Sequence, residues 1–208
     1  MREVKAKINP PSFFRSGIIM MQYKFIIRPV VIGLLLPSIV IPWINVNLFG
    51  YHPFSPLSIL EELFRNSSSL SQNQILLLDI TSSYKDTYLS IILSIMLYIM
   101  SVPTIITSLV WKKQRSVLLL LVSALAISSG LIWLFAVESF RSSFSHQAAS
   151  TGGLIGEEWK GKESTLVNRI IGSGSGQYFV IIAGIVALAG WLLEKIQLRR
   201  DLKSDLIS

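Results

Sequence analysis

A glycine-rich stretch, "GSGSG" at residues 172–176, precedes an apolar segment near the end of the chain. Glycine-rich loops bind phosphates when they follow a β-strand and begin a soluble helix, because their backbone N–H groups then surround the anion. Here the spacing is GxGxG instead of GxGxxG, the Walker lysine is missing, and the residues that follow are apolar over the length of a membrane span. We therefore interpret the glycines as a flexible joint between an exterior loop and a transmembrane helix.

Patterns typical of enzymes and metal proteins are missing from the sequence. The two histidines, His52 and His146, lack the HxxxH or HExxH spacing that places two ligands on one helix face. There is no cysteine, which excludes disulfides, zinc–thiolate sites and cysteine nucleophiles. A GxSxG nucleophile elbow is also missing. We therefore expect a protein that is not an enzyme and that holds no metal and no cofactor.

Hydroxyl side chains surround a proline in the second apolar segment. Pro103 removes a backbone hydrogen bond, and nearby hydroxyls can satisfy the carbonyl that it frees. Thr104 and Thr107 give this segment a polar face. Such a face lines a cavity in some membrane proteins, but it serves helix–helix packing more often. Both interpretations stay open at this point.

Small residues recur on one face of the last apolar segment. Ala183 and Ala187 have the small-xxx-small spacing, and Gly190 follows them. Small side chains let membrane helices approach closely. We expect this face to pack within the bundle or to bind a helix of a partner.

Composition indicates the environment of these segments. The chain has 208 residues, of which 51% are hydrophobic and only 15% are charged, and its mean hydropathy is +0.56. Soluble domains contain about 25% charged residues. A soluble domain of this size buries too little surface to hide so many apolar side chains. The lipid bilayer is therefore the expected second solvent.

Four apolar segments are long enough to cross a bilayer, which takes about 20 helical residues. We therefore predict an all-α integral membrane protein with four transmembrane helices. Arg28 lies near the beginning of the first span, where its side chain can extend to the headgroups. The predicted spans are 25–44, 88–111, 117–137 and 178–196, which leave an amino-terminal segment 1–24, a first loop 45–87, a link 112–116, a second loop 138–177 and a tail 197–208.

The distribution of Lys and Arg predicts the orientation of the spans. Residues 1–24 carry five basic residues and one acidic residue, the link 112–116 carries three basic residues and no acidic one, and further basic residues follow the last span. All three basic segments fall on one side of a four-span bundle. Both termini are therefore predicted to be cytoplasmic in a multi-pass protein of the cell membrane. This bias accounts for the net charge of +7 without a nucleic-acid partner.

The two long loops are expected outside, where they would form a small cap. The stretch "SPLSILEELF" predicts a short amphipathic helix, with capping-box spacing between Ser58 and Glu61. The stretch "ILLLDI", at 75–80, is consistent with a buried strand or with another apolar contact. Asn66 begins an Asn-Ser-Ser sequon and is a candidate glycosylation site.

The layout of four spans, cytoplasmic termini, a larger first exterior loop and a tryptophan at the end of the first span is similar to that of claudin-like proteins. Their Trp-Gly-Leu-Trp stretch and cysteine pair are missing here, so the resemblance is one of topology alone. We expect a non-catalytic scaffold or accessory subunit, in contact with the lipid bilayer and with other membrane subunits or a second copy. The alternative is a transporter or channel for a small neutral or lipid-like solute.

Overall fold

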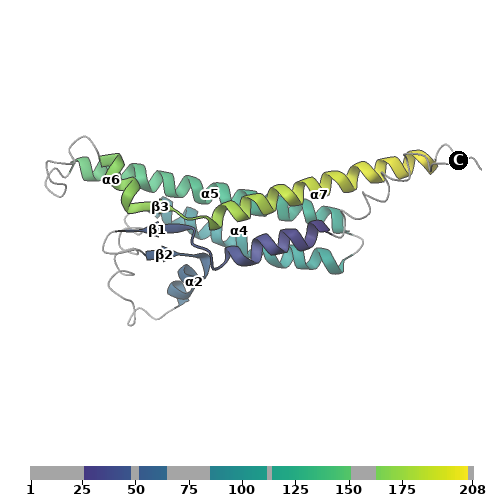
Figure 1. Cartoon of the computed structure of the whole chain (residues 1–208), viewed down its shortest axis with the longest axis horizontal. Coiled ribbons are helices and arrows are strands. Elements are labelled where there is room, and N and C mark those ends of the chain that lie inside the picture. The colour runs from purple at the N-terminus through teal and green to yellow at the C-terminus, as the bar shows by residue number, and fades with distance from the viewer. Residues whose placement is uncertain (1–25, 48–51, 65–84, 112–113, 151–162, 206–208) are drawn as a thin grey trace, which may run out of the picture.

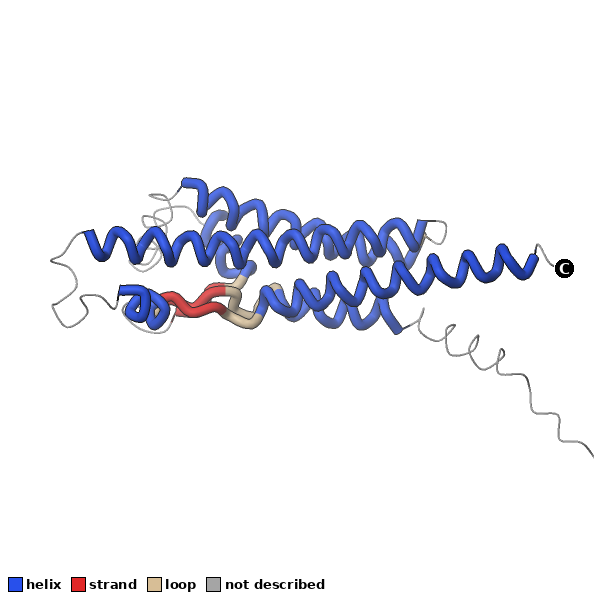
Figure 2. Tube along the Cα trace, turned by 90° about the horizontal axis from the view of Figure 1, so that it is seen from above, coloured by secondary structure: helices blue, strands red, loops and turns tan. Residues whose placement is uncertain are grey.

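The computed structural model describes residues 26–47, 52–64, 85–111, 114–150 and 163–205, and most of these residues are helical. The long helices lie side by side along the longest axis, and a small β-sheet lies toward one end of them, which we call the sheet end (Figure 1). Figure 2 shows the same arrangement from above, with the last helix extending beyond the others at the opposite end. Asn66 and the stretch 75–80 lie outside the described residues.

Three helices are long and apolar enough to cross a membrane. They are α4 (Lys85–Val110), α5 (Arg115–Ser150) and α7 (Gly176–Asp205), and their apolar stretches cover Leu89–Val110, Arg115–Ser145 and Gly176–Arg200. Only about a third of each apolar stretch is buried inside the protein. The remaining apolar surface faces outward, which is the pattern of a membrane protein.

The first predicted span, 25–44, differs from the structure. The helical part that the structure describes is Ile26–Ser38, about 20 Å at 1.5 Å per residue, and it ends six residues before the predicted end of the span. The chain then turns and enters strand β1 (Ile44–Val46). In this turn the Val40 and Ile41 N–H groups donate to the Pro37 carbonyl, and Pro42 then restricts Ile41 to extended conformations, so that the helix does not resume. The indole of Trp43 then donates to the Ser38 carbonyl at the end of the helix, over 2.8 Å.

Three short strands correct the prediction of an all-α fold. Strand β1 lies between β2 (His52–Phe54) and β3 (Ile171–Ser173), and both pairings are antiparallel. Strand β1 begins at the end of the predicted first span, β2 lies in the first predicted loop and β3 in the second, about 120 residues further along the chain. The sheet therefore joins the two loops at the sheet end of the bundle.

Both predicted loops contain helices. Helix α2 (Pro56–Phe64) forms where an amphipathic helix was predicted, but its cap is Ser55, three residues before the expected Ser58. The Ser58 N–H donates to Ser55 Oγ and the Ser55 N–H donates to Ser58 Oγ, which is the reciprocal pattern of a capping box. In the second loop, α5 continues through Ser150 to a length of about 54 Å. Helix α6 (Glu163–Ile170) then leads into β3.

Glycine residues bring α7 close to its neighbours. A Cβ at Gly184 would lie 2.6 Å from Cγ1 of Ile127 on α5, and a Cβ at Gly130 would lie 2.3 Å from Cγ1 of Ile181 on α7. The helices α5 and α7 therefore meet through reciprocal glycine contacts. Close approach of this kind is the usual basis of packing between membrane helices, where lipid competes equally well for apolar side chains.

Two serines connect α4 to α5. Ser94 Oγ donates to the Ser129 carbonyl over 2.7 Å, and Ser129 Oγ donates to the Ser94 carbonyl over 2.8 Å. Both side chains are completely buried. Each helix therefore gives the other one hydroxyl donor and one carbonyl acceptor, and both bonds form between the same two residues.

Candidate functional site: the junction between bundle and sheet

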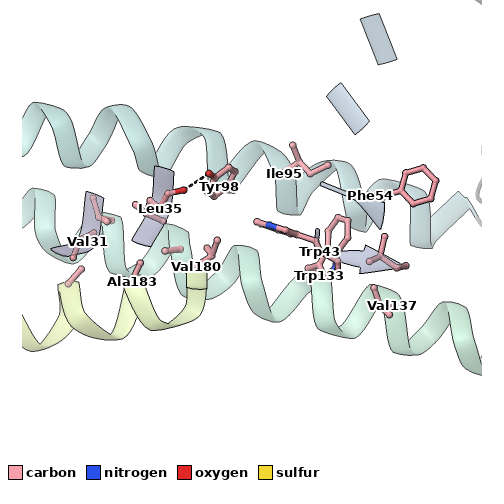
Figure 3. Packing of buried hydrophobic residues seen from close by; sticks show 14 of the residues in the cluster. Val31, Leu35, Trp43, Phe54, Ile95, Tyr98, Trp133, Val137, Val180 and Ala183 are labelled. Atoms are coloured by element: carbon pink, nitrogen blue, oxygen red, sulfur yellow. Dashed lines mark hydrogen bonds between the residues drawn. The ribbon is translucent and has the colours of Figure 1, made fainter. Parts of the chain in front are cut away.

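Trp43 is the central residue where the bundle meets the sheet. Its side chain is completely buried, and its ring meets Tyr98 of α4 and Trp133 of α5 edge to face, with ring centroids 5.3 and 5.0 Å away. Figure 3 shows these residues between the two helices, with Phe54 of β2 on the sheet side. Edge-to-face aromatic pairs contribute about 0.5–1.5 kcal/mol each beyond the area that they bury. We call Pro42, Trp43, Tyr98, Trp133, Gly174 and Gly176 the junction.

The first helix ends early, and the carbonyls at and beyond its end have no helical partner. The polar groups of the junction bond to this backbone. Tyr98 Oη donates to the Leu35 carbonyl over 2.6 Å, the dashed line in Figure 3. Trp133 Nε1 donates to the Trp43 carbonyl over 3.3 Å, and the Trp43 N–H donates to the Phe54 carbonyl over 2.8 Å. Backbone groups that are buried outside helices and strands need hydrogen-bond partners from the protein. The aromatic residues provide that satisfaction here.

The glycines at 172–176 form part of this junction instead of a loose linker. Gly174 N–H donates to the Trp43 carbonyl over 3.0 Å, and Gly176 N–H donates to the Pro42 carbonyl over 2.9 Å. A Cβ at Gly174 would lie 2.0 Å from the Pro42 carbonyl oxygen. Gly172 pairs with Asn45 in the sheet. Gly174 and Gly176 are therefore required for close approach to Pro42 and Trp43, whereas Gly172 would tolerate a side chain, and the interpretation of the stretch as a flexible joint is corrected.

Arg141 holds the extension of α5 against the edge of the sheet. Its Nε and Nη2 donate to the Ile171 carbonyl over 3.1 and 2.9 Å, and Nη2 also donates to Ser173 Oγ over 3.0 Å. Glu138 lies 3.3 Å from Nη1, but its side chain is 73% exposed, so this ion pair is screened by solvent. The main role of Arg141 is therefore to cap β3, which is an edge strand.

A second polar contact lies far from the sheet. Arg28 Nη2 and Glu194 Oε1 are 2.7 Å apart, and their side chains are only 6% and 15% exposed. This pair joins the first helix to α7, and a Cβ at Gly190, one turn earlier on α7, would lie 2.7 Å from Cγ2 of Ile27. The sequence places both charged residues at the predicted cytoplasmic ends of their spans, but their pairing was not predicted.

The residues singled out in the sequence occupy different places. Ala183 and Ala187 are completely buried in the bundle. Thr104 and Thr107 are half-buried on α4, and each hydroxyl donates to the carbonyl one turn earlier on the same helix, over 2.6 and 2.7 Å. His52 lies in β2 and His146 lies in the extension of α5, and the positions of their side chains are outside the described part of the structure.

The described residues contain no group of three or more His, Asp or Glu side chains arranged to hold a metal ion. The junction consists of aromatic rings, glycines and hydrogen bonds to the backbone, and these groups hold segments of the chain together. Comparison with protein-family models and with curated protein sequences finds no match for this chain.

Proposed function

We propose that this protein is a non-catalytic scaffold or accessory subunit of a membrane complex. One observation carries the proposal: the side chains of Tyr98, Trp43 and Trp133 all donate hydrogen bonds to backbone carbonyls of the same chain. Trp43 precedes β1, and its N–H donates to the Phe54 carbonyl of β2, so these bonds connect the bundle with the sheet. A rigid bundle that carries a sheet platform at one end is suited to positioning a partner.

The proposed topology has four spans in the cell membrane, with both termini in the cytoplasm and the sheet outside. The helix Ile26–Ser38 and the extended segment that follows it would together make the first crossing, from Arg28 to the sheet. The ion pair with Glu194 supports this arrangement, because it places the beginning of the first helix beside the basic end of α7. The basic link and tail support the same orientation.

Cysteine accessibility tests this topology in a background that contains no cysteine. Gln114→Cys lies in the link between α4 and α5, and Ser142→Cys lies in the extension of α5; both positions are exposed. In intact cells a membrane-impermeant maleimide should label Ser142→Cys alone, and it should label Gln114→Cys after permeabilisation. Labelling of Gln114→Cys in intact cells would reverse the orientation.

The outward face of α5 is the surface that we propose for a partner helix. Ala124 and Ser128 are exposed there at small-xxx-small spacing, between exposed Leu121 and Leu131. Small residues on a lipid-facing surface allow another helix to approach closely. In a complex that forms through this face, the protein would act as a scaffold by packing α5 against a helix of the partner.

The test compares Ala124→Phe and Ser128→Phe with Leu93→Phe, which lies on the exposed face of α4. After purification in mild detergent, the two α5 variants should lose a co-purifying subunit or a second copy, and the α4 variant should retain it. A protein that is monomeric and free of partners before any substitution would refute the scaffold role.

The alternative is a transporter or channel for a small neutral or lipid-like solute, with Thr104 and Thr107 lining its path. It has less support, because both hydroxyls are already donated within α4. Flux into liposomes, measured with Thr104→Val and Thr107→Val beside the unaltered protein, distinguishes the two functions. Flux that requires these hydroxyls would favour the transporter.

A further inference from the structure

A buried glutamine at the beginning of α7 has hydrogen-bonding capacity that the protein does not use. The side chain of Gln177 is completely buried. Neither its Oε1 nor its Nε2 has a hydrogen-bond partner among the described residues. A carboxamide removed from water without partners is strongly unfavourable, and buried polar groups in folded proteins are nearly always bonded to protein or to water.

The backbone at the same point adds another donor. The first N–H groups of an α-helix have no acceptor within the helix. In α7, the Gly176 N–H donates to the Pro42 carbonyl and the Tyr178 N–H donates to the Ser175 carbonyl. The Gln177 N–H lies between them and has no acceptor within α7. Helical side chains lean toward the amino-terminal end of their helix, so the carboxamide extends toward this N–H end of α7.

The neighbouring surface of α5 is closely packed and uncharged. A Cβ at Gly130 would lie 3.4 Å from the Gln177 carbonyl oxygen and 2.3 Å from Cγ1 of Ile181, so α5 and α7 touch at this level. Ser129, beside Gly130, donates its hydroxyl to the Ser94 carbonyl of α4. A ligand of Gln177 must therefore be small and must both accept and donate hydrogen bonds.

We propose that Gln177 binds an internal water molecule that bridges its carboxamide and the first turn of α7. Water accepts from an N–H group and donates to Oε1 at once, and buried waters in proteins make about three such bonds. An ion fits less well, because the carboxamide presents an acceptor and donors together and a lone charge satisfies only one kind. This inference concerns a hydration site within the bundle and does not depend on the scaffold role.

Water-edited solid-state NMR of the full ¹⁵N-labelled protein in lipid bilayers tests the site directly. Magnetisation from water should reach the Gln177 Nε2 protons at a rate within about twofold of that for the exposed Gln114 side chain. The backbone N–H of Ala183, which is completely buried, provides the dry reference. Transfer to the Gln177 carboxamide as slow as transfer to the Ala183 amide would overturn the proposal.

The variant Gln177→Met provides a second measurement, since methionine has a similar shape and no amide. If water satisfies the carboxamide, the Tm of Gln177→Met should be equal to or lower than that of the unaltered protein, and water transfer to the N–H at position 177 should fall. If the carboxamide has no partner, its removal should raise the Tm. Such a rise would overturn the proposal. Gln197→Met, at the opposite end of α7, is the matched control, and should leave water transfer at position 177 unchanged.

Discussion

Gly176 of α7 lies directly against the indole ring of Trp43, so that a Cβ at this position would be 2.2 Å from Cδ1 and 2.5 Å from Nε1. The ring is held elsewhere by Tyr98 and Trp133 and by its hydrogen bond to the Ser38 carbonyl. It therefore has little freedom to move aside. This contact fixes the beginning of α7 against the segment that leaves the first helix.

Gly176→Ala should destabilise the protein, because the added methyl group forces the indole or the beginning of α7 to shift. Overpacking of this kind costs about 1–3 kcal/mol. Thermal unfolding in detergent measures the effect. Gly172→Ala is the control, since its Cβ would lie 3.6 Å from the nearest atom, an ordinary contact with Asn45. Equal melting temperatures for the two variants would contradict the packing described for the junction.

Trp43→Phe should also destabilise the protein, because phenylalanine cannot donate to the Ser38 carbonyl. A buried acceptor left without its donor costs about 1–3 kcal/mol. The control is Trp111→Phe, at a residue that is 58% exposed. Chemical denaturation should separate the two variants clearly. A loss of stability in Trp111→Phe as large as that in Trp43→Phe would argue against a special role for the buried indole.

The Arg28–Glu194 pair should show strong coupling in a double-mutant cycle. Removing one partner of a largely buried pair leaves the other charge uncompensated, which costs about 3–5 kcal/mol, whereas apolar replacement of both is often neutral. Arg28→Met leaves the largely buried Glu194 carboxylate without this cation and should therefore be less stable than Arg28→Met/Glu194→Met. Lys195→Met, at an exposed neighbouring position, controls for the lost charge. Additive effects of the two substitutions would show that the pair contributes little.

Ser94→Ala and Ser129→Ala should each weaken the contact between α4 and α5. Hydrogen bonds between membrane helices contribute about 0.6 kcal/mol on average and up to about 1.7 kcal/mol. The two hydroxyls act at the same contact, so the double variant should differ from the sum of the single ones. Thr107→Val is the control, because its hydroxyl bonds only within α4. Steric-trap unfolding in bicelles has the precision to test this prediction.

Arg141→Ala should loosen the edge of the sheet without unfolding the bundle. The Ile171 carbonyl and Ser173 Oγ would lose their donors, so we expect faster hydrogen exchange in β1 and β3. Glu138→Ala removes only the exposed ion pair and should leave this exchange unchanged. If both variants exchange alike, the cap on Ile171 is not what protects the strand.

The amino-acid sequence by itself determined where α4, α5 and α7 lie. Each contains an apolar stretch of bilayer length, and such a stretch is stable in lipid only when its backbone groups bond internally, as in a helix. The helix at Pro56–Phe64 was also predictable, because amphipathic spacing and capping are local signals. The end of α5 was not predicted, because the polar residues after Val137 give no hydropathy signal for a helix, although Arg141 among them bonds to β3.

Only the tertiary structure decided how the two exterior segments join. Strands of three residues are too short to show an alternating pattern, and the pairing of Asn45 with Gly172 connects positions far apart in the chain. The role of the glycines was hidden for the same reason. Positions 174 and 176 must be glycine because Pro42 and Trp43 lie too close to admit a Cβ. A sequence does not reveal which distant segment a glycine must approach. Local chemistry thus determined the helices, and contacts between distant segments determined the junction.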